Sequence, residues 1–308
     1  MSSRPASRGS RPWLAGVLLL CSGAGPLAGE ALRIATWNVA NYGPTARVTS
    51  AGYRSDSPKP EAEKAALRAA LRRLDADVVA LQEMGPPAYL EELARDLARE
   101  GLVYPHRVVA ADGEPRRNAL LSRLPLHAVR TQRELEFPYL GQLTRLRRGL
   151  LEATLVTPGG ELTVVVLHLK SPLSEDPRDP RADALRRAEA GAVRDWLLER
   201  FPDPRRARFL VLGDCNEVPN GPAVQSLRRR GRTELLRLAP AADDRGDSWT
   251  HHYRRGETYA RVDLILFSPA TAPWIAGPGE VLDGPEVRQA SDHRPVVLRL
   301  TPPALNGG

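Results

Sequence analysis

One stretch decides the fold of this chain: FLVLGDCNEVPN, residues 209–220. Its first four residues are apolar and predict a buried strand that ends at Gly213, and polar side chains follow directly after that end. Because strand side chains alternate between faces, Asp214 and Asn216 are expected on one face and Cys215 on the other. The alternation predicts a carboxylate and a carboxamide side by side at the edge of a sheet.

This pair of polar groups suits the hydrolysis of a phosphate ester. Asp214 can hold a water molecule or a cation, and Asn216 can donate a hydrogen bond to an anionic oxygen. The alternative is a plain turn of the Gly-Asp-x-Asn type, in which the side chains bond to the backbone. Cys215 is interpreted as a small core residue behind the pair, because the alternation turns it inward.

Residues 1–29 differ from the remainder of the chain. Three arginines precede an apolar run at residues 13–21, and small residues follow up to Gly29. This order predicts a secretory signal peptide, and the apolar run is too short to span a bilayer. We therefore expect a periplasmic or secreted protein with no membrane span after cleavage. The alternative is an uncleaved membrane anchor.

The mature chain is mildly basic and cannot form an internal disulfide. The formal net charge is +7, and it falls to +4 without residues 1–29, which hold three arginines and no acidic residue. Such a charge suits an anionic partner without identifying one. Cys21 lies in the leader and only Cys215 remains after cleavage, so the core alone must hold the fold.

The sequence after the leader alternates between helical and strand patterns. Apolar periodicity predicts helices at residues 61–74 and 89–100 and strands at residues 77–83 and 102–110. Residues 40–60 are rich in Gly, Pro and Ser, show no periodicity, and are expected to form an irregular loop. No repeat, linker or low-complexity tract divides the chain, which indicates one mixed α/β domain.

Five predicted strands end or begin at a polar side chain, and a sixth strand carries one inside it. Each position alone has an ordinary explanation, as a solvated strand end or a satisfied core residue. Together they indicate a site, because mixed sheets collect ligand groups at strand ends. The positions are Asn38, Glu83, His168, the pair Asp214 and Asn216, Asp263, and the pair Asp292 and His293.

These ordered motifs resemble the endonuclease/exonuclease/phosphatase superfamily, which has the deoxyribonuclease-I-like fold. The resemblance covers residues 31–301 and rests on Thr36-Trp37-Asn38, Leu81-Gln82-Glu83, His168-Leu169-Lys170-Ser171, Gly213-Asp214-Cys215-Asn216, Val262-Asp263 and Ser291-Asp292-His293. It implies an α/β fold, a two-sheet β-sandwich flanked by helices in four layers, with the active site at one end of the sheets. It also implies a catalytic domain at residues 30–303 and a short C-terminal tail at residues 304–308.

The resemblance further implies a divalent cation held by Asn38, Glu83 and Asp292. Glu83 would be its principal ligand. The cation is expected to be Mg²⁺, with Mn²⁺ as the alternative, because Mg²⁺ prefers carboxylate, water and phosphate oxygens. Asp292 could instead orient its neighbour.

Five residues are expected to be catalytic by the same resemblance. Asp214 would orient and deprotonate the attacking water, and Asn216 would steady the phosphoryl oxygens as charge grows on them. His293, held and kept basic by Asp263, would contact the phosphate or share the proton transfer. His168 would act on the leaving-group side. The enzyme would be a metal-dependent phosphoesterase.

The favoured substrate is nucleic acid, hydrolysed by an endonuclease that works as a monomer. Arg148 and Lys170 are expected to bind it. Several arginines could meet a phosphate backbone. They are Arg116, Arg117, Arg145, Arg147, Arg148 and Arg228 to Arg230, and solvated surface is their alternative explanation.

Two other functions stay open. The same chemistry could act on a phospholipid or a small phosphorylated metabolite, and only residues 137–140 and 272–275 offer an apolar stretch for a membrane. A binding protein without activity could also retain the fold. His251 and His252 are expected to be surface or core residues rather than catalytic ones.

Overall fold

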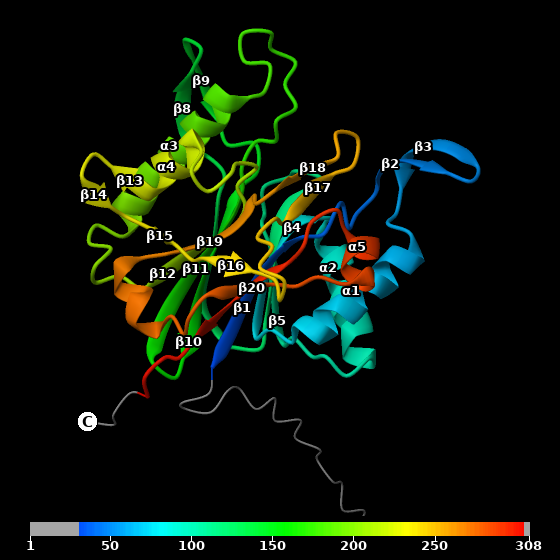
Figure 1. The fold of residues 1–308 in the computed structure, drawn as a ribbon, viewed down its shortest axis with the longest axis horizontal. Coiled ribbons are helices and arrows are strands. Elements are labelled where there is room, and N and C mark those ends of the chain that lie inside the picture. The colour runs from blue at the N-terminus through cyan, green and yellow to red at the C-terminus, as the bar shows by residue number, and fades with distance from the viewer. Residues whose placement is uncertain (1–30, 305–308) are drawn as a thin grey trace, which may run out of the picture.

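Two β-sheets form the centre of the fold in the computed structural model, which describes residues 31–304 (Figure 1). The predicted signal peptide at residues 1–29 lies outside the described residues. Within the described part of the chain, every helix is too short or too polar to cross a membrane.

The first sheet has seven strands, with β1 and β4 as a parallel pair near its middle. From one edge to the other, its strands are β16 (Ala241–Ala242), β20 (Gly279–Val281), β21 (Val296–Leu300), β1 (Leu32–Asn38), β4 (Val78–Met84), β6 (Arg117–Ser122) and β5 (His106–Val109).

The second sheet has six strands, with β11 and β12 as its parallel pair. Its strands in order are β15 (Arg237–Leu238), β19 (Asp263–Phe267), β12 (Phe209–Asp214), β11 (Gly160–His168), β10 (Leu150–Thr157) and β7 (Leu126–Gln132). The carboxyl ends of both parallel pairs carry predicted site residues. These ends are therefore where the site must form.

Strand alternation explains how the sheets and helices stack. In β1, Ile34 packs into the core between the two sheets, whereas Ala35 and Trp37 pack against helices on the outer face. The helices of that outer face are α1 (Glu61–Leu74), α2 (Pro87–Arg99) and α5 (Pro285–Ala290).

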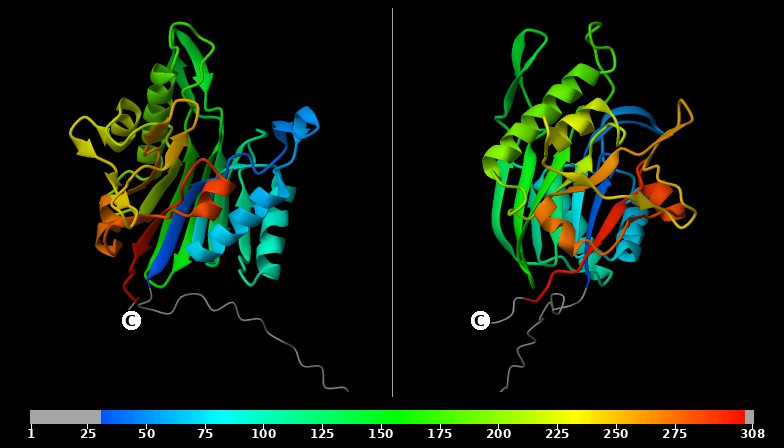
Figure 2. Two further views of the ribbon diagram at one scale, coloured as in Figure 1. Left: turned by 45° about the vertical axis from the view of Figure 1, so that its right-hand side comes forward. Right: turned by 60° about the vertical axis from the view of Figure 1, so that its left-hand side comes forward.

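Helices on the second sheet complete the four layers. In β12, Leu210 and Leu212 face the other sheet, whereas Phe209 and Val211 face the helices. These helices are α3 (Asp183–Arg200) and α4 (Pro222–Arg228), and a 3₁₀ helix, η1 (Pro269–Trp274), lies near the start of β12. Figure 2 shows the sheets between the two groups of helices. The predicted four-layer sandwich is confirmed.

Four two-stranded hairpins lie outside the sheets, and one of them corrects a prediction. They are β2 (Thr45–Thr49) with β3 (Gly52–Ser57), β8 (Glu136–Tyr139) with β9 (Gln142–Arg145), β13 (Arg229–Arg230) with β14 (Thr233–Glu234), and β17 (His251–Tyr253) with β18 (Thr258–Ala260). The expectation of an irregular loop at residues 40–60 was wrong. No residue of either strand of the β2–β3 hairpin is buried, so the strands lack the apolar alternation that sequence analysis detects.

Candidate active site

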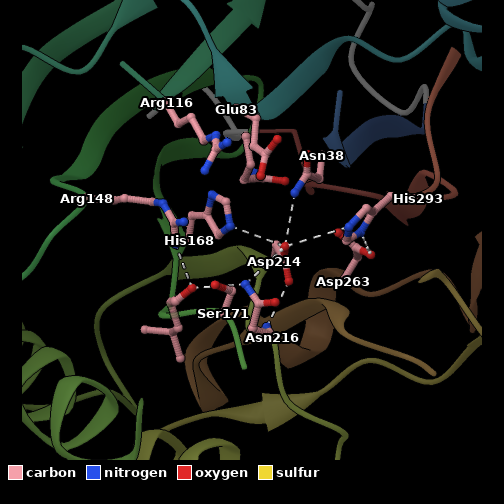
Figure 3. Close-up of polar contacts among 12 residues, drawn as sticks. Asn38, Glu83, Arg116, Arg148, His168, Ser171, Asp214, Asn216, Asp263 and His293 are labelled. Carbon is pink, nitrogen blue, oxygen red and sulfur yellow. Dashed lines mark hydrogen bonds and ion pairs between the residues drawn. The ribbon is translucent and has the colours of Figure 1, made fainter. Parts of the chain in front are cut away.

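Asp214 is the centre of the predicted site. The residue is 1% exposed at the end of β12. Its Oδ2 atom accepts hydrogen bonds from Nδ2 of Asn38 at 3.0 Å and Nδ2 of Asn216 at 3.3 Å. Nε2 of His168 lies 3.3 Å from the same oxygen, and Nε2 of His293 lies 3.9 Å from it (Figure 3). One carboxylate thus gathers four of the predicted residues.

The backbone around Asp214 combines the two alternatives that the sequence left open. Asn216 has a positive φ of 48°, so the extended strand ends before it. Its backbone N–H donates to Oδ1 of Asp214 at 2.8 Å, which is the side-chain-to-backbone bond of a turn. The turn nevertheless brings the two side chains together and leaves Cys215 buried on the helix side, as predicted.

Gly213 is required for this arrangement. Its φ is +145°, and a Cβ atom there would lie 1.9 Å from the carbonyl oxygen of Leu167 on β11. Only glycine permits this close approach of the strands that present Asp214 and His168.

His293 lies on the anionic side of Asp214. Asp263 pairs directly with Asp214 in the β12–β19 register, and its Oδ2 atom lies 2.7 Å from Nδ1 of His293. Burial alone would lower the pKa of His293, but the charges of Asp263 and Asp214 outweigh it and raise the pKa to about 10. His293 is therefore an imidazolium at neutral pH, as its predicted role with phosphate requires.

His168 lies on the opposite, cationic side of Asp214. Burial and the neighbouring charge of Arg148 lower the pKa of His168, and the contact with Asp214 only partly opposes them. Its Nδ1 atom is buried without a hydrogen-bond partner among residues 31–304. His168 is accordingly a neutral imidazole whose Nε2–H donates to Asp214.

These interactions keep Asp214 ionised. Burial would raise the pKa of its carboxyl group, but the hydrogen bond from His168 and the charge of His293 lower it below the ordinary range. Asp214, Asp263 and His293 also have ligand atoms that lie within 4.8 Å of one another, a separation that permits metal binding.

Glu83 and Asn38 lie at the ends of β4 and β1. Glu83 has a φ of +62° at a register shift in β4, and its Oε2 atom accepts the backbone N–H of Asn41 at 3.0 Å. Within residues 31–304, its other carboxylate oxygen makes no hydrogen bond or ion pair. Oδ1 of Asn38 accepts the backbone N–H of Ala40 at 3.0 Å. These oxygens form a donor set suited to a hard divalent cation.

Asp292 is placed differently from the other two predicted metal ligands. Its Oδ2 atom lies 3.7 Å from Nε2 of His251, and no hydrogen bond or ion pair joins it to Asn38 or Glu83. His251 also stacks on His293, with ring centroids 4.4 Å apart. His251, expected to be a surface or core residue, is half-buried and contacts two of the predicted site residues. The alternative role for Asp292, orienting its neighbours, agrees with this geometry.

The two predicted substrate-binding residues lie in different surroundings. Arg148 is half-buried beside His168, and its guanidinium donates to the carbonyl of Leu169 at 2.9 Å (Figure 3). Lys170 instead uses its ammonium to bind the carbonyls of Ser171 and Leu173, so it braces the loop after β11. Its predicted contact with substrate would require those bonds to open.

Arg116 is a further cation at the site. Figure 3 shows it beside Glu83, and its Nε atom donates to Oδ1 of Asn41 at 2.5 Å. Most of the other arginines in the predicted basic set bind elsewhere. Arg117 lies near Asp112, Arg145 binds Glu134, Arg228 binds the carbonyl of Leu236, Arg229 lies near Glu234 and Arg230 near Asp195.

Comparison with known structures shows the same fold. The chain is similar to the human Nocturnin catalytic domain with bound sulfate (17% identity, TM-score 0.59, covering 89% of this chain and 94% of that one). It is also similar to sphingomyelinase C from Streptomyces griseocarneus (16% identity, TM-score 0.59, covering 88% of this chain and 99% of that one). A third similar structure is truncated TDP2 from Caenorhabditis elegans (17% identity, TM-score 0.58, covering 89% of this chain and 99% of that one). At these identities the likeness concerns the fold alone.

Sequence comparison identifies the family. No curated protein sequence matches the chain. The sequence profile of the Endonuclease/Exonuclease/phosphatase family matches residues 35–293, which span every predicted site residue from Asn38 to His293. The chain therefore belongs to this family of phosphoester hydrolases, as its motifs predicted.

Proposed function

We propose that this protein is a secreted, divalent-cation-dependent phosphodiesterase that cleaves nucleic acid as a monomeric endonuclease. The observation that carries the proposal is the environment of Asp214, a buried ionised carboxylate between a neutral and a charged imidazole. An attacking water needs such an acceptor, and a phosphoryl group needs cationic donors beside it. Secretion rests on the predicted signal peptide at residues 1–29.

The residues around Asp214 have separate roles in this proposal. Asp214 accepts a proton of the attacking water and aligns its oxygen with the phosphorus. Asn38 and Asn216 hold Asp214 in place, and the expected contact of the Asn216 amide with phosphoryl oxygens would require its bonds to Asp214 and Leu169 to open. His293 donates a hydrogen bond to a phosphoryl oxygen through Nε2. His168 supports the carboxylate from the leaving-group side. Asp263 fixes the ring of His293 through Nδ1.

Asn38 and Glu83 would hold the divalent cation. The free oxygen of Glu83 and the absence of nitrogen or sulfur in this donor pair fit Mg²⁺, with Mn²⁺ as a substitute. When bound, the cation would stabilise negative charge on the phosphoryl oxygens.

Nucleic acid is favoured by cations that lack a carboxylate partner. Among residues 31–304, no carboxylate lies within 4.0 Å of the guanidinium of Arg116 or Arg148, although Glu83 is close enough to affect the pKa of Arg148. Free guanidinium groups can bind consecutive phosphates, and such binding weakens as salt rises. We therefore expect cleavage to slow markedly when salt is raised severalfold.

The proposal is tested with residues 30–308 and supercoiled plasmid in Mg²⁺, with and without EDTA. We expect nicking that stops in EDTA and falls by about 10²- to 10⁴-fold in Asp214→Ala, because the acceptor for the water proton is lost. Asp195→Ala, a change at a half-exposed residue on α3, is the matched control. Equal nicking by wild type and Asp214→Ala would contradict the proposal.

A phospholipid substrate is the second candidate, and one observation favours it. The β8–β9 hairpin projects from the active-site end of the molecule (Figure 1), and its Leu143 is 68% exposed. The other apolar stretch, residues 272–275, offers less, because Trp274 is buried. Vesicle sedimentation separates the candidates: binding to choline or anionic vesicles that Leu143→Asp abolishes would favour a lipid.

A further inference from the structure

A cavity of about 610 Å³ opens beside the predicted active site. Three aromatic rings line it, together with four arginines, two carboxylates and Ser291. Its lining includes Trp249, His252, Tyr259, Arg254, Arg288 and Asp292. A second cavity of about 360 Å³ shares His252, Arg254, Arg288 and Asp292 and extends to Asn41, whose backbone binds Glu83. The two cavities therefore connect the site to the β17–β18 hairpin.

Strand β17 links this cavity to the catalytic residues. His251 stacks on His293, whereas His252, the next residue, lines the cavity. This is the alternation expected of neighbouring strand residues. The backbone N–H of His252 also donates to the carbonyl of Asp292 at 3.0 Å, which fixes the hairpin to the loop that carries His293. A group bound in the cavity would thus adjoin the phosphate held by His293.

The aromatic rings form a preassembled platform. His252 and Tyr259 are stacked with centroids 4.3 Å apart and an interplanar angle of 4°, and Trp249 packs against Tyr259 in a T-shape at 4.9 Å. Tyr259 remains 54% exposed. An exposed aromatic ring that its neighbours already hold in place can stack on a planar base with little loss of side-chain entropy.

The charges in the cavity favour an anionic ligand. No carboxylate within residues 31–304 lies within 4.0 Å of the Arg254 guanidinium, whose partner is the carbonyl of Arg288 at 3.4 Å. Arg288 itself binds Asp283. Of the two carboxylates that line the cavity, Asp247 lies 3.8 Å from Arg245, and Asp292 lies 3.7 Å from Nε2 of His251.

This combination discriminates between ligand classes. Aromatic rings alone could hold a quaternary ammonium group, but a free guanidinium beside them repels a cation. A nucleotide offers both complementary parts, a planar base for the rings and a phosphate for the guanidinium.

We propose that this cavity is a nucleotide subsite, in which the base next to the scissile phosphate stacks on Tyr259 and the adjoining phosphate binds Arg254. The assignment rests on the proposed phosphodiesterase function and names its substrate class. It makes the β17–β18 hairpin a determinant of specificity for nucleic acid over simple phosphodiesters.

Two chromogenic esters test the subsite: thymidine 5′-(p-nitrophenyl phosphate) and methyl p-nitrophenyl phosphate, which lacks the nucleoside. We expect wild type to prefer the thymidine ester in kcat/KM. Tyr259→Ala should lower that preference about tenfold through KM, whereas Tyr259→Phe should keep it because the ring remains. Tyr53→Ala, on the exposed β3 strand, and Arg205→Ala, before β12, are the matched controls. An unchanged preference in Tyr259→Ala would overturn the proposal.

Direct binding separates this proposal from the proposed function. If wild type hydrolyses neither ester and does not nick plasmid, the phosphodiesterase proposal fails, and calorimetric titration with adenosine 5′-monophosphate and with inorganic phosphate still tests the cavity. We expect Tyr259→Ala to weaken the nucleotide about tenfold and leave phosphate unchanged, and Arg254→Ala to weaken both. A wild type that binds no nucleotide, or binds it as well as Tyr259→Ala does, would overturn the subsite.

Discussion

His168 and His293 flank the same carboxylate with the same side chain, yet their charges differ. Both histidines are almost fully buried, at 6% and 7% exposure. His293 meets Asp263 as well as Asp214, and its pKa rises to about 10 even though burial opposes the charge. Burial and Arg148 lower the pKa of His168, and Asp214 alone does not compensate. Neighbouring charges, rather than burial, therefore decide which histidine is cationic.

The difference in charge gives the two histidines different roles in the proposed site. A charged imidazole both donates a hydrogen bond and stabilises negative charge, which suits contact with a phosphoryl oxygen. A neutral imidazole only donates a hydrogen bond, which suits support of Asp214. Replacements that keep the hydrogen bond and remove the charge should therefore affect the two sides unequally.

The largest expected contrast is between His293→Gln and His168→Gln. We expect His293→Gln to lower kcat by about 10²- to 10³-fold, because glutamine cannot carry the charge. His168→Gln should cost about tenfold, since its amide can still donate to Asp214. Nicking rates and hydrolysis of bis(p-nitrophenyl) phosphate measure both variants. His127→Gln, in an exposed pair with Glu161, is the control. Equal losses at the two positions would refute the division of roles.

Asp263→Asn removes the carboxylate that does most to raise the pKa of His293. Without the Asp263 carboxylate, the pKa of His293 should fall from about 10 toward its ordinary value of 6.5, so the ring loses its charge at a lower pH. On the alkaline side, the activity of Asp263→Asn should fall at a pH at least one unit lower than the activity of wild type does. At pH 8 we expect about a tenfold loss.

A smaller shift in the same direction is expected for Asp292→Asn. Asp292 also raises the pKa of His293, but less than Asp263 and Asp214 do. An unshifted alkaline limb in Asp263→Asn would show that Asp263 does not set the charge of His293.

The sequence alone predicted which polar residues lie at the strand ends, but it did not predict which of them contact one another. Apolar runs locate β1, β4, β11 and β12, and polar residues at their ends are visible in the sequence. The stack of His251 on His293 is not, because it depends on a bridge between residues 42 positions apart in the chain. Strand alternation correctly predicted that Asp214 and Asn216 are neighbours. The structure brings them together through a left-handed turn at Asn216, which the alternation did not predict.

The opposite charges of the two histidines could not be predicted for the same reason. Asp263 reaches His293 only because β19 pairs with β12 in a register that places it opposite Asp214. Arg148 reaches His168 from the segment before β10. Both neighbours are distant in sequence, and a motif shows which residue types are present without showing which carboxylate faces which ring.

The smallest expected effect is on stability, where the two histidines should act on opposite sides of neutrality. The folded pKa of His293 lies above the unfolded value of 6.5, so its stabilisation is complete below pH 6.5 and is lost as the pH rises toward 10. The folded pKa of His168 lies below 6.5, so its contribution is complete above pH 6.5 and is lost as the pH falls.

Urea unfolding of the EDTA-treated protein between pH 5 and 10 measures how the free energy of unfolding changes with pH on the acidic and the alkaline side. We expect a change of about 1.4 kcal/mol for each unit of difference between the folded and unfolded pKa. His293→Gln should flatten the alkaline limb alone, and His168→Gln the acidic limb alone, because each removes only its own titration. His127→Gln should keep both wild-type slopes. If His293→Gln flattened the acidic limb instead, the imidazole of His293 would be neutral in the folded protein, and the contrast between the two sides of Asp214 would disappear.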